Sequence, residues 1–448
     1  MKILTYIRGC LLIFIFICSG VSVHAQDLPR HGVIGLAVAA PDASHPEDLK
    51  TNPPTVKTVV PGSAGEAAGI QAGDILREVD GAPITSSTDF AARIARHLGG
   101  DSVSIRIVRA GQELTKTATL KARPYETSPD ADVLYTSVTV GGARRRVIVT
   151  HPKAPGRYPA VLIMGGLGCY SLDGALTQQE GYGRIMAALA KQNFVTMRVE
   201  KTGEGDSEGP PCTDLKATAD LEVRGYVAGL AALRSYTYVD TTKIFVFAHS
   251  LGPLIGSLVL PHESVRGFIA AETIGKSWFE YMLENIRHQD ALVGQPLDQV
   301  EDDVRLQEKC LHEYFVLHHS ADDVKKLAPQ CGDMIGSFVG VPYTFMQQIG
   351  EINLAKQWKQ SDIPVLVIYG TSDPATSAEE SRYLVQAINS FHPGRATYVE
   401  LAGMGHDFRK YDSELEFLTR RNDPAKPHTF DDEFIDTVLK WLAQQLRG

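Results

Sequence analysis

The sequence lacks a second long hydrophobic run after its N-terminus, and it lacks a cluster of basic residues. No segment beyond the first 25 residues is apolar over the about 20 positions that a membrane span needs, so we expect no such span in the mature chain. The 44 Lys and Arg and 53 Asp and Glu residues give a formal net charge of -9 and are spread along all 448 positions, which argues against nucleic acid as a partner. An internal repeat is also absent, which excludes a repeat architecture.

The first 25 residues have the order of a secretory signal peptide. Lys2 and Arg8 come first, an apolar block from Leu11 to Ile17 follows, and Val23-His24-Ala25 supplies a small-residue cleavage site. The apolar block is too short for a comfortable membrane span. We therefore expect residues 1–25 to be removed and the protein to be secreted or periplasmic, with an uncleaved anchor as the alternative.

Cysteine is scarce, with six in the chain, two of them inside the expected signal peptide. An even number in an oxidising compartment favours disulfides, and four cysteines allow three connectivities. The expected pairs are Cys169 with Cys212, in loops after two neighbouring strands, and Cys310 with Cys331, which closes a local loop in a helical segment. Four unpaired thiols are the alternative.

A chain of 448 residues exceeds what one hydrophobic core usually supports, so we expect two domains. Residues 31–122 have the pattern of a small β-rich unit, and residues 123–132, with two prolines, that of a linker. From 133 to 448, short apolar strands alternate with helical segments, which predicts an α/β fold: a mostly parallel sheet covered by helices on both faces. The alternation breaks over 272–361, where a charged helical insertion is expected to form a cap over a pocket.

The β-rich unit resembles a bacterial PDZ domain. The resemblance rests on the string PGSAGEAAGIQAGDIL at 61–76, followed by Val79-Asp80-Gly81. It implies that the loop Gly32-Val33-Ile34-Gly35 offers backbone amides to the carboxylate of a peptide C-terminus, and that the peptide adds as a strand beside the helix carrying Phe90 and Ile94. In the alternative interpretation, the glycines only form a turn and the chain's own neighbouring segment fills the groove.

The most informative local pattern is an apolar run that ends at a serine. Ile244-Phe245-Val246-Phe247 reads as a buried strand, and Ala248-His249-Ser250-Leu251-Gly252 follows it at once. Small residues on both sides of a serine allow the sharp strand-to-helix turn called a nucleophile elbow. An ordinary strand-to-helix loop has the same letters, so Ser250 needs partners before it is a candidate nucleophile.

Candidate partners follow two later strands. Asp373 comes just after the apolar segment 363–369, and His406 lies in a glycine-rich loop after 396–401. Each sits where a parallel sheet exposes its loops, and the intervening chain holds one helix and one strand, as a crossover needs. A base that takes the proton of Ser250 and an acid that holds the base would make this serine a nucleophile.

The span from residue 133 to the C-terminus resembles the α/β-hydrolase family, which has the chain order nucleophile, acid, base. The resemblance implies that Ser250 attacks, His406 is the base and Asp373 orients it. Ala248 departs from the usual glycine but is small enough for the turn. Glu272, after the apolar segment 265–271, is an alternative acid, and Asp373 and His406 could each be merely structural.

Acyl transfer also requires backbone donors for the oxyanion. The amide of Leu251, directly after the serine, is the first candidate. The glycine-rich segment 165–169 follows a buried strand, and either Gly166 or Leu167 could supply the second donor. The alternative is a glycine turn with no catalytic part.

Other features are predicted to be structural. The loop from Glu200 to Ser207 looks like a family loop that packs beneath the site rather than a phosphate cradle, and His249 is expected to pack away from Ser250. The histidines of the insertion lack the carboxylates and spacing of a metal site, so we predict no metal and no cofactor; these are His312, His318 and His319.

The sequence therefore predicts an exported serine hydrolase with a peptide-binding module. A carboxylic ester is the default substrate, and a small-molecule ester or a short peptide is the expected partner. A serine peptidase, of the aminopeptidase or prolyl-oligopeptidase kind, is the alternative, because related α/β-hydrolases cleave short peptides. A non-catalytic binding protein is the second alternative. The sequence does not indicate an oligomeric state.

Overall fold

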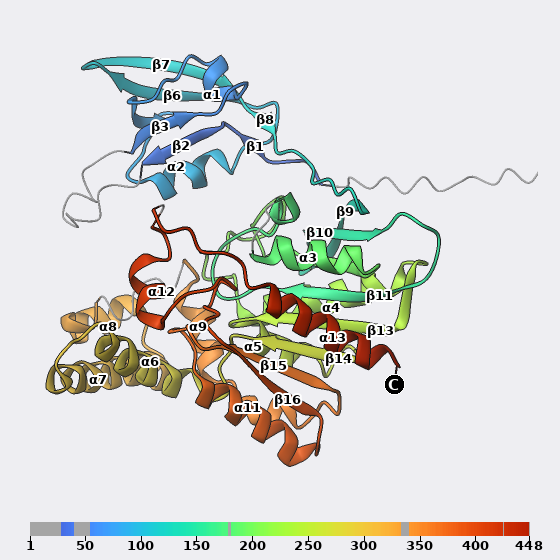
Figure 1. The fold of residues 1–448 in the computed structure, drawn as a ribbon. Coiled ribbons are helices and arrows are strands. Elements are labelled where there is room, and N and C mark those ends of the chain that lie inside the picture. The colour runs from blue at the N-terminus through green and yellow to red at the C-terminus, as the bar shows by residue number, and fades with distance from the viewer. Residues whose placement is uncertain (1–27, 40–53, 178–180, 333–339, 424, 448) are drawn as a thin grey trace, which may run out of the picture.

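The computed structural model describes residues 28–39, 54–177, 181–332, 340–423 and 425–447. The expected signal peptide, residues 1–25, lies outside these ranges. Within them, no helix combines the length and the apolar character needed to cross a membrane. Figure 1 shows a small N-terminal unit above a larger α/β unit.

The N-terminal unit is a twisted antiparallel sheet with two helices. In the described residues its strands follow the order β2-β3-β4-β6-β7, with β5 beside β4, and a separate short ribbon pairs β1 with β8. The β6–β7 hairpin turns at Ala110 and Gly111, both at positive φ, as a tight hairpin requires. The elements are β1 Gly32–Val33, β2 Leu36–Ala39, β3 Thr55–Val59, α1 Ala64–Ala67, β4 Ile75–Val79, β5 Ala82–Pro83, α2 Ser87–Ile94, β6 Ser102–Arg109, β7 Gln112–Thr119 and β8 Lys121–Ala122.

The larger unit is built on a sheet whose described strands have the order β16-β15-β14-β13-β11-β12-β10-β9. The pairings from β12 through β16 are parallel, and β9 and β10 form an antiparallel hairpin at the edge. The strands are β9 Ala131–Val140, β10 Ala143–Pro152, β11 Tyr158–Met164, β12 Val195–Val199, β13 Val239–His249, β14 Gly267–Ala271, β15 Val365–Gly370 and β16 Ala396–Leu401.

Helices cover both faces of this sheet. Along β13, Phe245 and Phe247 point into one hydrophobic core and Val246 and Ala248 into the other, as the two-residue period of a strand dictates. The first core is closed by α3 Gly181–Lys191 and α13 Asp432–Arg447, and the second by α4 Ala219–Ser235, α5 Gly252–Val259 and α11 Ala378–Phe391. The predicted two-sided α/β architecture is present.

Between β14 and β15 the chain is mostly helical. A capping box at Ser277 and Glu280 starts the first of these helices. A disulfide joins Cys310 to Cys331 inside this segment, and a second joins Cys169 to Cys212, so both predicted pairs are present. The helices are α6 Trp278–Leu292, α7 Leu297–Leu311, the π-helical turn His312–Val316, α8 Ala321–Leu327, the 3-10 turn Pro329–Cys331, α9 Tyr343–Gly350 and α10 Leu354–Trp358. Shorter pieces elsewhere are the 3-10 turn Ala175–Thr177 and α12 Glu414–Arg420.

A buried arginine joins the two units. Arg30, just before β1, donates from Nη1 to Asp173 and Asp206 of the larger unit, and all three side chains are almost completely buried. Its other nitrogens donate to the carbonyl oxygens of Arg123 and Pro124, at 3.0 and 2.7 Å. The segment that enters the PDZ-like unit is therefore fixed to the larger unit by charged hydrogen bonds.

Candidate active site

The strand-to-helix turn at Ser250 has the geometry of a nucleophile elbow. Ser250 follows β13 directly, precedes α5, and has a φ of 60°, a region that non-glycine residues rarely occupy. Its amide donates to the carbonyl oxygen of Ala271 at 3.0 Å, and its carbonyl accepts from Thr273 Oγ1 at 2.8 Å. These two bonds hold the strained turn against the end of β14.

Close approach explains the small residues around the turn. A Cβ at Gly252 would lie 3.0 Å from the carbonyl oxygen of Gly165 and 3.3 Å from Cβ of Ala248. A Cβ at Gly166 would lie 2.8 Å from Cβ of Ser250. Ala248 is fully buried in the hydrophobic core, and the elbow forms with alanine at this position.

The structure brings Ser250, His406 and Asp373 together. His406 Nε2 lies 3.0 Å from Ser250 Oγ, and His406 Nδ1 lies 2.8 Å from Asp373 Oδ2. Asp373 is completely buried; its Oδ1 accepts from the amide of Ala375 at 2.7 Å and its Oδ2 from Thr376 Oγ1 at 2.6 Å. An imidazole held in this way can accept a proton from the serine.

The surroundings of Asp373 and His406 shift the pKa values of these two groups in opposite directions. Burial works to raise the pKa of Asp373, but the charge of His406 and the hydrogen bonds from His406, Glu272 and Thr376 outweigh it and hold that pKa well below its usual range. Burial also works against the imidazolium of His406, but Asp373 outweighs it and raises the pKa of His406 above its ordinary value. Asp373 is thus an anion that favours charge on His406.

The glycine-rich loop after β11 runs beside Ser250, and hydrogen bonds fix its peptide groups. The amide of Gly166 donates to Tyr182 Oη at 3.3 Å, so it is already engaged. The carbonyl of Gly166 accepts from Lys201 Nζ at 2.8 Å and from Tyr170 Oη at 3.2 Å. In a trans peptide the next amide points the opposite way from this carbonyl. Of the two candidates, Leu167 therefore has the amide that points away from Lys201.

His249 does more than pack. Its Nε2 donates to the carbonyl oxygen of His406 at 2.9 Å, and its Nδ1 accepts from Tyr182 Oη at 2.6 Å. Burial, and next the charge of His406, lower the pKa of His249 to about 3, so it stays neutral. With the Gly166 amide donating to Tyr182, one chain of hydrogen bonds links the glycine loop to the loop that carries His406.

Sequence reasoning missed Tyr182, Tyr170 and Lys201. Lys201 is the second residue of the Glu200–Ser207 loop. Its ammonium also contacts Gly168 O at 2.9 Å and Glu222 at 3.6 Å. The Glu200–Ser207 loop therefore supports the site through Lys201, whose ammonium donates to carbonyl oxygens of the glycine-rich loop. The only signal in the sequence was the position of Lys201, two residues after a buried strand.

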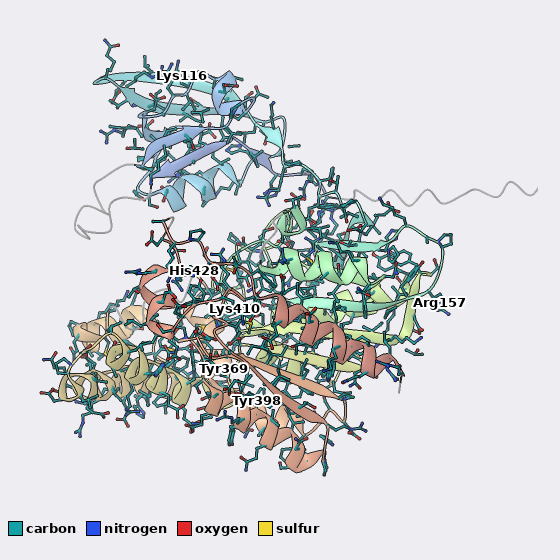
Figure 2. All side chains as sticks on the ribbon, in the orientation of Figure 1. Lys116, Arg157, Tyr369, Tyr398, Lys410 and His428 are labelled. Atoms are coloured by element: carbon teal, nitrogen blue, oxygen red, sulfur yellow. A yellow bond between two sulfur atoms is a disulfide. The ribbon has the colours of Figure 1, made fainter. Side chains whose placement is uncertain are left out.

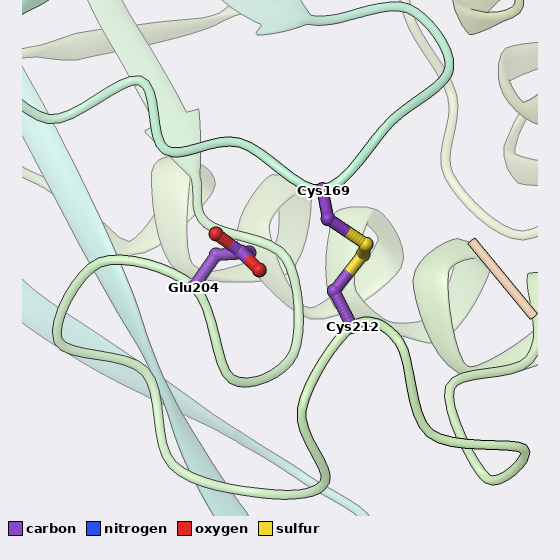
Figure 3. Close-up of side chains that lie close together, drawn as sticks. All are labelled: Cys169, Glu204 and Cys212. Atoms are coloured by element: carbon purple, nitrogen blue, oxygen red, sulfur yellow. A yellow bond between two sulfur atoms is a disulfide. The ribbon is translucent and has the colours of Figure 1, made fainter. Parts of the chain in front are cut away.

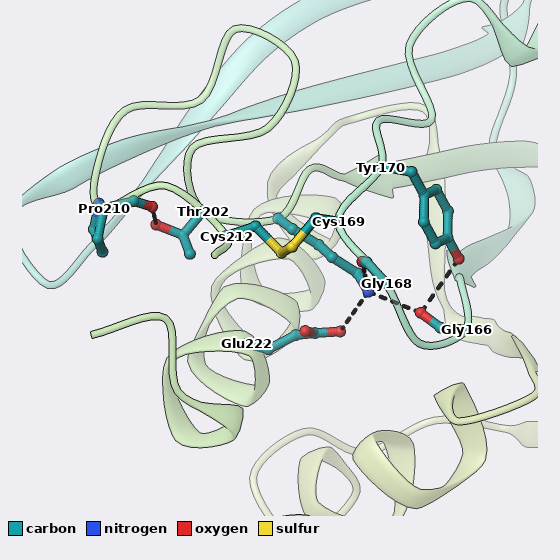
Figure 4. Close-up of a disulfide and its surroundings, with 9 residues drawn as sticks. Gly166, Gly168, Cys169, Tyr170, Thr202, Pro210, Cys212 and Glu222 are labelled. Atoms are coloured by element: carbon teal, nitrogen blue, oxygen red, sulfur yellow. Dashed lines mark hydrogen bonds and ion pairs between the residues drawn. A yellow bond between two sulfur atoms is a disulfide. The ribbon is translucent and has the colours of Figure 1, made fainter. Parts of the chain in front are cut away.

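The Cys169–Cys212 disulfide lies against the same loop, as Figure 4 shows beside Gly166, Gly168 and Glu222. Glu204 approaches the two sulfur atoms in Figure 3. Because those sulfur atoms are bonded to each other, this group offers no thiolate for a metal. A second close group consists of Asp373 and His406, which are hydrogen-bonded to each other, and the further carboxyl of Glu272.

The residues expected to form the peptide groove lie mostly in the core of the small unit. Phe90 and Ile94 of α2 are 3% and 6% exposed, and Ile34 is 5% exposed. Gly32 and Val33 pair with β8 as part of the short ribbon. Gly35 has a φ of 74°, and a Cβ there would meet Ser63. The edge strand β2 borders this group in the described residues.

Comparison with family models gives two matches. Residues 169–410 match the model described as serine aminopeptidase, S33, and residues 55–109 match the model of the PDZ domain. The first match covers more than half of the chain and includes the elbow, Asp373 and His406.

Curated relatives resemble the two parts separately. The esterase EstD of Thermotoga maritima is 21% identical over 309 residues, 68% of this chain and 67% of that esterase. The periplasmic pH-dependent serine endoprotease DegQ of Escherichia coli is 37% identical over 65 residues, and the chain spans only 14% of its length. Among solved structures, Est1E from Butyrivibrio proteoclasticus aligns over 70% of this chain and 99% of its own, with 15% identity and a TM-score of 0.43.

Proposed function

Since the chain belongs to the serine aminopeptidase S33 family and is a serine hydrolase of the α/β-hydrolase fold that carries a PDZ domain, we propose that Ser250, His406 and Asp373 are its catalytic triad. The observation that carries this proposal is the pair of contacts made by His406, 3.0 Å to Ser250 Oγ and 2.8 Å to Asp373. Asp373 and Ser250 engage the two nitrogens of the imidazole, which favours Asp373 over Glu272 as the orienting acid.

In the proposed reaction, His406 Nε2 takes the proton of Ser250 as Oγ attacks an acyl carbonyl carbon. The resulting imidazolium is stabilised by Asp373 and returns the proton to the leaving group, which departs and leaves an acyl-enzyme. Water then attacks the acyl carbon with His406 again as the base, which frees the acid and restores Ser250. The amides of Leu251 and Leu167 are the proposed donors to the oxyanion.

A carboxylic ester is the proposed substrate class, and similarity to EstD supports it. A peptidase is the second candidate, because the matching family model is described as an aminopeptidase.

The PDZ domain is proposed to bind a peptide C-terminus by strand addition at β2, which is an edge strand among the described residues. The two disulfides and the PDZ similarity to a periplasmic protease support export to the periplasm or the medium.

The substrate class is tested by a matched panel of chromogenic compounds. The purified full chain is assayed with short-chain nitrophenyl esters and with aminoacyl and prolyl nitroanilides, and its active serine is titrated with a fluorophosphonate. An ester hydrolase gives a kcat/KM that is higher for the esters at equal serine titre. Faster cleavage of an aminoacyl amide would assign the peptidase instead, and a folded protein that the fluorophosphonate does not label would reject both.

We expect activity to be lost as the pH falls through the pKa of His406. His406 must be neutral to accept the serine proton, and Asp373 raises its pKa above the ordinary value of 6.5. The acidic limb of kcat/KM, and of the fluorophosphonate labelling rate, is therefore expected to have its midpoint above pH 6.5. His249, with a pKa of about 3, does not contribute to this limb. A midpoint clearly below 6.5 would contradict the ion pair between His406 and Asp373.

A further inference from the structure

Glu272 is a buried carboxyl group behind the triad, and the proposed reaction leaves it without a role. It follows β14 directly, is fully buried, and has a φ of 48°, the left-handed region. Its two chain neighbours are the residues that bind the backbone of Ser250, Ala271 through its carbonyl and Thr273 through its hydroxyl. The strained backbone is thus fixed in place by the elbow itself.

The side chain of Glu272 lies against Asp373. One carboxyl oxygen of Glu272, one of Asp373 and one nitrogen of His406 all lie within 4.8 Å of one another. Thr376 Oγ1, which donates to Asp373 Oδ2 at 2.6 Å, is 3.5 Å from Glu272 Oε2. No hydrogen-bond donor among the described residues reaches Glu272 Oε1. A buried carboxylate oxygen with no donor is costly, whereas a protonated carboxyl can use that position to donate.

The charges around the pair decide which carboxyl keeps a proton. Two anions this close in a buried site repel each other, so one shared proton is the stable arrangement. Burial first, and then Asp373, raise the pKa of Glu272 well above its usual value and outweigh the hydrogen bonds from the amide of Gly370 and from Thr376, which lower it. Asp373, in contrast, has the imidazole of His406 to stabilise its charge. Other titratable groups that act on the pair are His249, which stays neutral, His288 on α6, and the phenols Tyr281, Tyr369 and Tyr398, the last two on β15 and β16 (Figure 2). Asp407 and Arg421 act on His406 with opposite sign, and the Glu272 variants leave both unchanged.

We propose that Glu272 is a positioning residue for the triad: a neutral carboxylic acid that donates its O–H to the carboxylate of Asp373 and so fixes the group that orients His406. This inference rests on the proposed function. The donated hydrogen bond stabilises the anionic form of Asp373 and spreads part of its charge, so Asp373 attracts a proton to His406 less strongly than an unbonded carboxylate would. The strain at Glu272 places its carboxyl where this bond can form.

Two replacements of Glu272 separate a donor from an anion and from simple packing. Glu272→Gln keeps a donor of the same shape but has no acidic proton, and Glu272→Leu removes the donor. The probes are the pH dependence of the fluorophosphonate labelling rate and of kcat/KM for nitrophenyl acetate. We expect Glu272→Gln to keep the acidic midpoint of the wild type, and Glu272→Leu to raise it by about 0.5 pH unit or more because Asp373 then acts on His406 undiminished.

Other patterns of midpoints would overturn the proposal. If Glu272 were an anion, Glu272→Gln would remove a negative charge beside His406 and lower the midpoint. If Glu272 only filled space, neither variant would move the midpoint, whatever it did to thermal stability. Thermal unfolding of each variant shows whether it is folded before it is assayed.

An infrared measurement tests the protonation state even if Glu272→Leu does not fold. At neutral pH, the wild type is expected to have the carbonyl band of a protonated Glu272, and Glu272→Gln is expected to lose that band while the band of Glu200, which is also buried and has a pKa raised to about 7, remains. Identical carbonyl bands in the wild type and Glu272→Gln would reject the inference. Failure of the wild type to react with the fluorophosphonate at any pH would instead reject the proposed function, so the two failures are distinguishable.

Discussion

Replacing Ser250 with alanine is expected to abolish fluorophosphonate labelling and to lower kcat on the best nitrophenyl ester by about 10⁶-fold, the loss typical of removing the nucleophile of a serine hydrolase. Without Oγ, no acyl-enzyme can form, and His406 Nε2 loses the group that lies 3.0 Å away. The oxyanion donors and substrate contacts are retained, so a small rate above that in water should remain. KM on that ester is expected to change little.

Ser235→Ala is the matched control for Ser250→Ala. Ser235 ends α4, is exposed at the surface, and its hydroxyl donates to Ala232 O at 2.7 Å. This variant should label and turn over like the wild type. Labelling of Ser250→Ala at the wild-type rate would assign the nucleophile to another residue and would remove the basis of the proposed reaction.

Replacing Arg30 with alanine is expected to destabilise the hydrolase domain by about 3–5 kcal/mol, the cost typical of removing one member of a buried ion pair. The change would leave Asp173 and Asp206 buried with less positive charge to balance them. It would also remove a guanidinium that stacks over Tyr125 and Tyr135, at 4.7 and 4.8 Å.

Urea unfolding followed by tryptophan fluorescence measures this effect in the correct domain, because all three tryptophans, at 278, 358 and 441, belong to the hydrolase domain. Arg144→Ala is the matched control. Arg144 pairs with Glu208, and both side chains are about two-fifths exposed. Loss of such an exposed pair should cost less than about 1 kcal/mol. Equal unfolding midpoints for the two arginine variants would show that Arg30 is not the anchor between the domains.

Features encoded in short segments were predictable from the sequence. The β13 run and its small residues predict the elbow because an elbow is a local turn, and the order of Ser250, Asp373 and His406 predicts which loops must meet. Both disulfide pairs are also confirmed. The choice between Gly166 and Leu167 stayed open because it depends on where Tyr182 and Lys201 place their polar atoms.

The sequence did not predict contacts between residues that lie far apart in the chain. His249 was expected to pack, yet it joins Tyr182, 67 positions away, to the carbonyl of His406, 157 positions away. The segment expected to be a linker contains Glu126, which is buried and pairs with Arg198 at 2.6 Å. Nothing in the local composition of either segment indicates such a partner.

The sequence by itself determined the fold class and the domain types, because these follow from hydrophobic periodicity, turn residues and short motifs. It also predicted the chain order of the proposed triad and favoured the two cysteine pairs that the structure contains. Only the tertiary structure decided how the polar groups behind the site are paired. The burial of Glu272 against Asp373 and the anchoring of Arg30 depend on the low polarity of the interior and on distances between segments far apart in the chain. The low polarity of the interior and the short distances between these segments arise only once the sheet has formed and its loops have come together.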